Sequence, residues 1–253
     1  MLATDGSDRL TDKGRLLSLQ WRDFTDAQPG PMSLAADTRA APFAILPVGA
    51  TEQHGGVLPV GTDWMVATEL AVGVGAALGG YVLPPIPIGT SMEQRGSNGT
   101  AWLRPETLAN VVRDVSDSLA TWGMTRLAII SGHGGNFILG PTVRELNADH
   151  PERLVVVVPE RIKHGADGLA PDDLHAGARE VSMGAHLFGS PVPGTDHDFV
   201  PDAHRDELNH RALLEISPTG VWGRPSQADA AQGEKDLDDS ITRITDFLRE
   251  VLL

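Results

Sequence analysis

Residues 43–63 read FAILPVGATEQHGGVLPVGTD, and they combine a strand signal with a cluster of polar side chains. It opens with the apolar run 43–46, which is followed by Pro and Gly and therefore favours a buried β-strand. Glu52, His54 and Asp63 come within a few residues of the end of that run. Carboxylate oxygens and imidazole nitrogens suit zinc, manganese or iron, so the segment just past the strand predicts a metal site.

The composition excludes several classes of function. The 253 residues are 41% hydrophobic, which is enough to bury a large core. Asp and Glu exceed Lys and Arg by 34 to 20, and the resulting net charge of -14 argues against binding to nucleic acids or anionic membranes. The chain has no cysteine, which excludes disulfides, thiolate zinc sites and a cysteine nucleophile. Because no apolar run reaches membrane-span length and no signal-peptide core is visible, we expect a cytoplasmic protein.

The pattern along the chain predicts one α/β domain after a polar start. Residues 1–40 are rich in Gly, Pro and Asp, and we expect an N-terminal extension with a short docking helix at residues 16–24. Residues 41–253 are expected to form a single domain. Its predicted strands are residues 43–47, 81–83, 126–130 and 154–159, and its predicted helices are 62–78, 105–122, 137–148, a segment within 172–187, and 234–252. Residues 189–218 are expected to be loop. Apolar strands that alternate with helices indicate a mostly parallel sheet covered on both faces.

Two of the polar loops are expected to meet at one edge of this sheet. Ligands of open parallel sheets bind outside the carboxyl ends of the strands. Glu52, His54 and Asp63 follow one strand at that end, and His133, in the loop SGHGGN, follows another. Four such ligands could hold one metal, or two if a carboxylate bridges them. A bridged pair suits hydrolysis, because it generates a hydroxide and polarises the scissile carbonyl group.

The same region offers further catalytic groups. Gly134, Gly135 and Asn136 could form a nest of backbone N–H groups that binds an oxyanion or a phosphate. His175 and Glu180 lie five residues apart at a loop-to-helix junction, where one could bind metal and the other could shuttle protons.

Other interpretations of these residues remain open from the sequence alone. Asp63 could cap the helix that it precedes, and SGHGGN could be a tight turn. Isolated histidines are expected to be surface or packing residues: His150, His164, His186 and His210. A second cluster could also bind metal, but its Pro-rich setting favours a solvated loop: His197, Asp198, Asp202, His204 and Asp206. Several further side chains could line a pocket: Met92, Glu93, Gln94, Trp102 and Trp222.

Four motifs, taken in order, resemble those of the creatininase (creatinine amidohydrolase) family: LPVGATEQHGGVLPVGTD, SGHGGN, HAGAREVS and TGVWGRP. The resemblance extends from about Trp21 to the end of the chain. It implies a three-layer α/β/α fold, two divalent metal ions per chain (Zn, Mn or Fe) and hydrolysis of a non-peptide or unusual amide. It also implies a homo-oligomer, which in creatininase itself is a hexamer.

The resemblance assigns a role to each matching residue. Glu52 and His133 would bind one metal and His54 the other, with Asp63 bridging them. His175 matches the catalytic histidine, which would donate a proton to the leaving nitrogen. Glu180 matches a family glutamate that is a ligand candidate for the second metal.

The chain also departs from the family pattern, as a divergent member would. Creatininase has a glutamate ligand at the position of Gly135 and a tryptophan just before the position of His175; here residues 171–174 contain no aromatic side chain. Residues 55–56 are Gly-Gly in place of Gly-Pro, and Val181 replaces a threonine. Creatinine is therefore not the expected substrate.

Together these observations predict a metal-dependent hydrolase that uses a metal-bound hydroxide to cleave an amide, cyclic amide or formamide bond of a small molecule. Two alternatives remain: a peptidase acting on a modified peptide, of the mycofactocin-precursor type, and a non-catalytic module that binds a small anion on the same scaffold.

Overall fold

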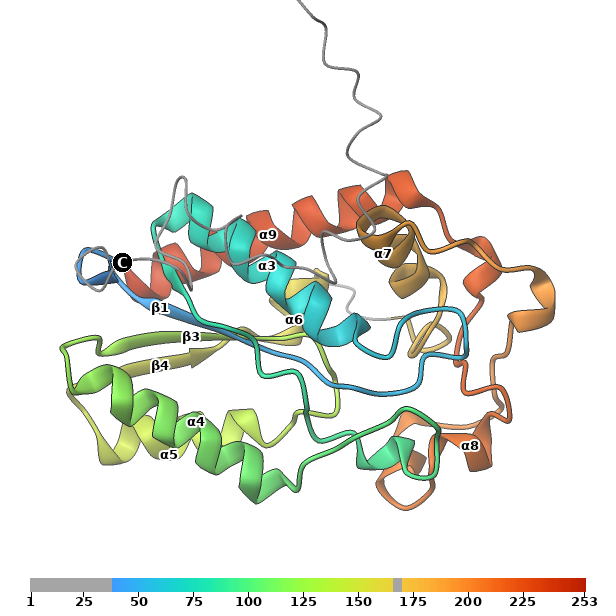
Figure 1. The fold of residues 1–253 in the computed structure, drawn as a ribbon, viewed down its shortest axis with the longest axis horizontal. Helices are drawn as coiled ribbons and strands as arrows, with labels where there is room; N and C mark the ends of the chain where they lie inside the picture. Colours follow the sequence, from blue (N-terminus) through green and yellow to red (C-terminus); the bar gives the residue numbers. More distant parts are fainter. Residues whose placement is uncertain (1–37, 166–169) are drawn as a thin grey trace, which may run out of the picture.

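A parallel sheet lies at the centre of the protein (Figure 1). The computed structural model describes residues 38–165 and 170–253, so the docking helix expected at residues 16–24 lies outside the described part, as does most of the expected extension. The sheet has four strands in the order β2-β1-β3-β4. Their bounds are β1 Ala44–Val48, β2 Tyr81–Val82, β3 Arg126–Ser131 and β4 Leu154–Val157. All strand pairs are parallel, and β1 pairs with β3 from Ala44 opposite Leu127 to Val48 opposite Ser131.

Helices cover both faces of the sheet (Figure 1). On one face lie α3 (Thr62–Leu78), α6 (Glu160–His164), α7 (Ala178–Phe188) and α9 (Ala230–Leu252). On the other face lie α4 (Pro105–Ala120) and α5 (Leu139–Asp149). Alternate residues of each strand enter the two cores: Ile45 and Ile130 pack toward α3 and α9, and Leu46 and Ile129 pack toward α4 and α5. These layers confirm the predicted three-layer α/β/α fold.

Several element boundaries differ from the predictions because of local capping. The helix expected from residue 234 begins at Ala230, since the Asp229 carboxylate accepts a hydrogen bond from the Gln232 N–H at 2.9 Å. The expected loop 189–218 contains three short helices: η4 (Thr195–His197), η5 (Arg205–Asn209) and α8 (Leu213–Ile216). Two further single turns are η3 (Met92–Gln94) and η6 (Pro225–Gln227).

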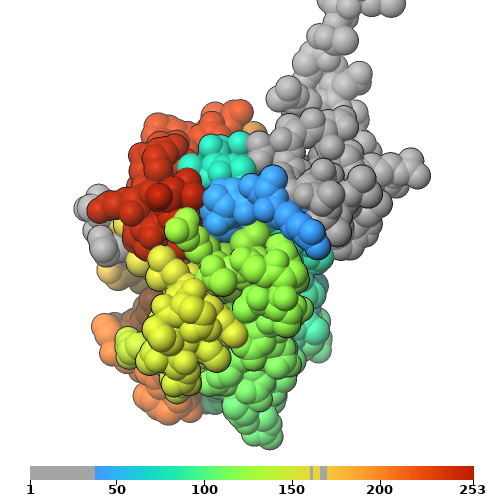
Figure 2. Space-filling view, turned by 90° about the vertical axis from the view of Figure 1, so that its left-hand side faces the viewer, coloured from blue at the N-terminus to red at the C-terminus, as the bar shows by residue number. Residues whose placement is uncertain are grey.

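The two ends of the sheet have different surroundings. Figure 2 looks onto the end where the strands begin, where the blue, green, yellow and red segments pack side by side. The opposite end carries the long segments that follow β1, β2 and β3, together with the chain from η4 to α8 (Figure 1). In the described residues, no helix combines the length and the apolar character needed to cross a membrane.

Candidate metal centre and active site

The loop after β1 holds Glu52 and His54 in the interior, where each is 1% exposed. The Glu52 N–H donates to the Val60 carbonyl at 2.9 Å, which closes the loop on itself. Nδ1 of His54 lies 3.1 Å from the carbonyl oxygen of Glu52. A carbonyl oxygen only accepts hydrogen bonds, so Nδ1 carries a hydrogen and Nε2 is the nitrogen that faces the centre.

Asp63 enters the same centre from the first turn of α3. Two glycines allow α3 to approach this closely: a Cβ on Gly49 would lie 2.2 Å from the Cα of Trp64, and one on Gly132 would lie 2.0 Å from the carbonyl oxygen of Asp63. Oδ1 of Asp63 is 3.2 Å from Nε2 of His54, and Oδ2 is 3.2 Å from Nδ1 of His133. The helix-cap interpretation is wrong, because Gly61 precedes the helix and no side chain caps it.

His133 follows β3 and lies between carboxylates on both sides of its ring. Nδ1 is 3.4 Å from Oε1 of Glu52, and Nε2 is 3.0 Å from Oε1 of Glu93. Glu93 comes from η3 and was expected only as a pocket-lining residue. A Cβ on Gly135 would lie 2.3 Å from Nε2 of His133 and 2.8 Å from Oε1 of Glu93. Glu93 therefore brings a carboxylate close to the position where creatininase carries a glutamate and this chain carries glycine.

His175 and Glu180 reach the centre from the segment that leads into α7. The Trp222 N–H donates to the His175 carbonyl at 2.8 Å, and this backbone pairing fixes the histidine. Oε2 of Glu180 accepts a hydrogen bond from the N–H of Ala176 at 2.6 Å and lies 3.8 Å from Nε2 of His54. Ala176 has a φ of 49°, a left-handed conformation that is unusual for alanine and that turns the chain between the two side chains.

Two glutamines surround His175. Its Nε2 lies 2.8 Å from the carbonyl oxygen of Gln53, so Nε2 carries the hydrogen and Nδ1 faces the centre, 3.5 Å from Oε1 of Glu52. The Gln53 side chain donates to the Gly220 carbonyl and to the Gln94 side chain, both at 2.9 Å. The sequence analysis did not predict Gln53 as a site residue, because no pattern distinguishes it from an ordinary polar residue of the loop.

Burial and close charges shift the pKa values of this cluster strongly. Burial raises the pKa of Glu52 to about 8, although the neighbouring His133 opposes the shift. Burial alone would lower the pKa of His54, but the charges of Asp63, Glu180 and Glu52 outweigh it and raise that pKa to about 10. Burial would raise the pKa of Asp63, but the two adjacent histidines hold it below its usual range.

The other two histidines shift in opposite directions. Burial would lower the pKa of His133, but Glu52, Asp63 and Glu93 raise it well above its usual value. Burial and the positive charge of His54 lower the pKa of His175 to about 4. His175 is therefore neutral at neutral pH and can accept a proton.

The donor set fits divalent metal ions. Some of its buried polar atoms make no hydrogen bond to the described residues, including Oε2 of Glu52, Nε2 of His54 and Oδ2 of Asp63. Buried polar atoms are almost always satisfied, so converging unsatisfied oxygens and nitrogens indicate a bound group. Among the residues that the structure describes, potential ligand atoms lie within 4.8 Å of one another in each of three groups: Glu52, Glu93 and His133; His54, Asp63 and Glu180; Glu52, His54 and His175.

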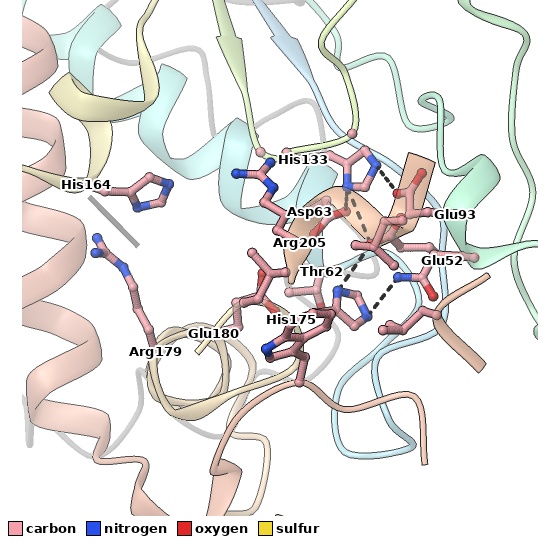
Figure 3. A pocket seen from close by; sticks show the side chains of 18 of the residues that line it. Glu52, Thr62, Asp63, Glu93, His133, His164, His175, Arg179, Glu180 and Arg205 are labelled. Carbon is pink, nitrogen blue, oxygen red and sulfur yellow. Dashed lines mark hydrogen bonds and ion pairs between the residues drawn. The ribbon is translucent and has the colours of Figure 1, made fainter. Parts of the chain in front are cut away.

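A cavity of about 540 Å³ opens from this cluster (Figure 3). Gly134 and Gly135 line it, whereas the Asn136 side chain is bonded to the protein: it donates to the Gly49 carbonyl and accepts from the Thr90 N–H, both at 3.0 Å. Of the aromatic and polar residues expected to line a pocket, Glu93, Gln94 and Trp222 do so and Met92 and Trp102 do not. His164, expected to be a surface or packing residue, also lines the cavity.

The alternative cluster in residues 197–206 does not converge on a metal site. None of its members belongs to the ligand sets found in the described residues. Asp198 instead accepts hydrogen bonds from the N–H and hydroxyl of Ser226, and His204 accepts one from the Asp206 N–H at the start of η5.

Comparison with known proteins places the chain in a family. The family described as Creatininase: Creatinine amidohydrolase matches residues 32–248. The chain is 32% identical over 222 residues to the mycofactocin precursor peptide peptidase of Mycobacterium ulcerans, across 80% of this chain and 84% of that protein. It is 35% identical over 232 residues to the creatinine amidohydrolase of Pseudomonas putida, across 81% and 88%. A solved creatininase whose description specifies Mn superposes with a TM-score of 0.75 at 25% identity, over 89% of this chain and 99% of that one. The chain therefore belongs to the creatininase family of hydrolases.

Proposed function

We propose that this protein is a dinuclear metal-dependent amidohydrolase that cleaves a C–N bond of a small substrate. The observation that carries the proposal is the position of Asp63, whose two oxygens each lie 3.2 Å from a different histidine. A carboxylate in this position can bridge two cations. His133 and Glu52 would hold the first, and His54 and Glu180 would hold the second. Zn, Mn or Fe would suit these ligands.

The chain's own residues would complete the chemistry. When bound, a pair of divalent ions activates water and polarises the carbonyl group of the amide. Nδ1 of His175 faces the centre and, with its pKa lowered to about 4, accepts a proton from the attacking water. The protonated imidazole then donates that proton to the nitrogen as the C–N bond breaks. Gly134 and Gly135 line the cavity, and their N–H groups would stabilise negative charge on the carbonyl oxygen.

Two substrate classes suit this cavity. The first is a non-peptide amide, cyclic amide or formamide other than creatinine, because residues 171–174 lack the tryptophan that precedes the catalytic histidine in creatininase. The second is a short or modified peptide, which is supported by the similarity to a mycofactocin precursor peptide peptidase and by a cavity of about 540 Å³ with an apolar wall. A non-catalytic anion-binding module has less support, since it would not need Asp63 buried between two histidines.

Metal analysis of Asp63→Ala tests the proposal. We expect about two divalent ions per chain in the gently purified protein and fewer than one in the variant, whose helical circular dichroism should be unchanged. Asp246→Ala is the matched control, because Asp246 is 68% exposed and pairs only with Arg249 in the described structure. Full metal content or full activity in Asp63→Ala would rule out the bridging role.

A substrate panel separates the two classes. Turnover of formamides and lactams by the metal-loaded protein, without turnover of short peptides, supports the first class, and the reverse supports the second. Binding of small anions without any turnover would favour the non-catalytic module.

We also propose that the protein is cytoplasmic and forms a homo-oligomer, possessing six subunits if it follows creatininase itself. Light scattering coupled to size-exclusion chromatography measures the subunit number directly, and a monomeric mass would exclude the oligomer.

A further inference from the structure

Arg205 extends from η5 to the edge of the metal centre, far from it in sequence. A Cβ on Gly134 would lie 3.1 Å from Nη2 of Arg205, so the guanidinium lies directly against the loop that carries His133. Figure 3 shows Arg205 beside His133 and Asp63, and both Arg205 and Gly134 line the cavity. Arg205 lies in residues 189–218, which were predicted to be loop, and the sequence analysis assigned it no role.

The guanidinium of Arg205 has no partner within the described part of the chain. No hydrogen bond or ion pair joins it to a described residue, and it is exposed to the cavity. Several arginines elsewhere pair with carboxylates: Arg95 with Glu215, Arg113 with Glu145, Arg211 with Glu207 and Arg224 with Asp172. The exposed arginines 39, 104, 126 and 144 also make no hydrogen bond or ion pair to a described residue, but none of them lines the cavity. In a chain of net charge -14, a cation without a carboxylate partner beside an active-site cavity is available to a ligand.

The surroundings of Arg205 define what that ligand can be. The cavity wall near η5 includes apolar side chains, among them Leu208, Leu174 and Phe137, which is 68% exposed. A guanidinium binds carboxylates and phosphates through two parallel hydrogen bonds. Arg179 also lines the cavity, but its Nε lies 3.9 Å from Oδ2 of Asp236. One guanidinium without a carboxylate partner, next to a carboxylate-rich centre, matches a monoanion better than a phosphate dianion, whose excess charge the nearby carboxylates would repel.

We propose that Arg205 binds a carboxylate group of the substrate next to the scissile amide. The inference rests on the proposed amidohydrolase function and narrows its substrates to amides that also carry a carboxylate. Such a carboxylate can come from an N-acyl amino acid or from the C-terminus of a short peptide. In both cases the apolar wall would contact the side chain next to that carboxylate.

Binding measurements with matched acids and amides test this proposal. N-acetylphenylalanine and its amide represent the first source, and Gly-Gly-Phe and its C-terminal amide represent the second. Each probe is titrated calorimetrically into the metal-loaded wild type, Arg205→Gln, Arg205→Lys and the control Arg113→Gln, which changes a surface arginine paired with Glu145. Metal content is measured for every variant.

We expect the acid of at least one pair to bind about tenfold more tightly than its amide in the wild type and in Arg113→Gln, as for a charge-assisted hydrogen bond. Arg205→Gln should bind acid and amide equally, and Arg205→Lys should keep part of the preference. The pair with the larger Arg205-dependent preference identifies the source of the carboxylate. Equal binding of acid and amide by the wild type, no binding of either acid, an unchanged preference in Arg205→Gln, or loss of metal from that variant would each overturn the proposal.

These results are distinguishable from failure of the proposed function. An Arg205-dependent acid preference without turnover of any amide would retain the carboxylate site and reject the amidohydrolase. Turnover of amides without a preference for the acid probes would retain the amidohydrolase and reject the carboxylate site.

Discussion

Replacement of Glu93 by glutamine should weaken metal binding on the His133 side of the centre. Oε1 of Glu93 lies 3.0 Å from Nε2 of His133, and the Glu93 side chain is only 17% exposed, so solvent screens its charge little. His133 presents Nδ1 to Glu52 and Asp63, which leaves the Nε2–H for Glu93. A carboxylate this close to the outer ring nitrogen attracts its proton, and such a partner orients the ring and raises the basicity of the ligating nitrogen.

The expected loss follows from that contact. Loss of an outer carboxylate beside a ligating histidine lowers metal affinity by about 10–100-fold. Glu93→Gln keeps the volume of the side chain and removes its charge, so packing against Gly135 should be preserved. Only one of two bound ions should be affected, because His54 and Glu180 lie on the other side of Asp63.

A competitive titration measures this effect. The metal-free protein is titrated with Zn²⁺ against a chromophoric chelator, and the two binding steps are fitted separately. Glu145→Gln is the control, since Glu145 is 60% exposed and pairs with Arg113 on the surface. If both Zn²⁺ affinities of Glu93→Gln equal those of the wild type, the reasoning is refuted. An equal loss of affinity in both binding steps would also refute it. A loss much greater than 100-fold in one step would instead mean that Glu93 is itself a ligand, in the group with Glu52 and His133.

Three further predictions test the same centre. His175→Gln should lower kcat by about 10²–10⁴-fold with metal content unchanged, as measured by turnover and elemental analysis, since only the proton carrier is lost. Gly135→Ala should lower the free energy of unfolding by about 1–3 kcal/mol in denaturant titrations, because its Cβ would lie 2.3 Å from Nε2 of His133. Zn²⁺ binding at pH 7 should release protons, detected by calorimetry in buffers of different ionisation enthalpy, because the pKa of His54 is raised to about 10 and this proton must leave before Nε2 binds metal. The affinity for Zn²⁺ should therefore rise with pH below 10, and a pH-independent affinity would contradict the ligand assignment of His54.

The fold could be predicted from the sequence because the strands fall in short apolar runs. All five residues of β1 are buried. A short apolar run that Gly and Pro residues follow favours a buried strand over other structures. Helix ends that are capped by a side chain several residues away are harder to predict from the sequence. The helix expected within residues 172–187 begins only at Ala178, where Asp173 accepts the N–H groups of Ala178 and Arg179 at 2.7 and 3.1 Å. The short helices in residues 189–218 are too brief to leave a periodic pattern.

Part of the site could be predicted for a similarly simple reason. Glu52, His54 and His133 follow strands, and the carboxyl ends of parallel strands share one edge. The structure brings these residues together with Asp63, His175 and Glu180. Their roles as metal ligands remain predictions until metal content is measured.

The positions of Glu93 and Arg205 at the site depend on the order of the strands in the sheet and on the packing of the loops. The order of residues along the chain does not give either. β1 lies between β2 and β3, so the segment after β2 that carries Glu93 meets the loop of His133 at the edge of the sheet. By position in the motif, the resemblance to creatininase leads us to expect a glutamate at position 135, where this chain has glycine. In the structure, Glu93 of η3 brings a carboxylate to within 2.8 Å of where a Cβ on Gly135 would lie. Comparison by position in space therefore finds a candidate carboxylate, Glu93, beside His133, where comparison by position in the motif finds only glycine.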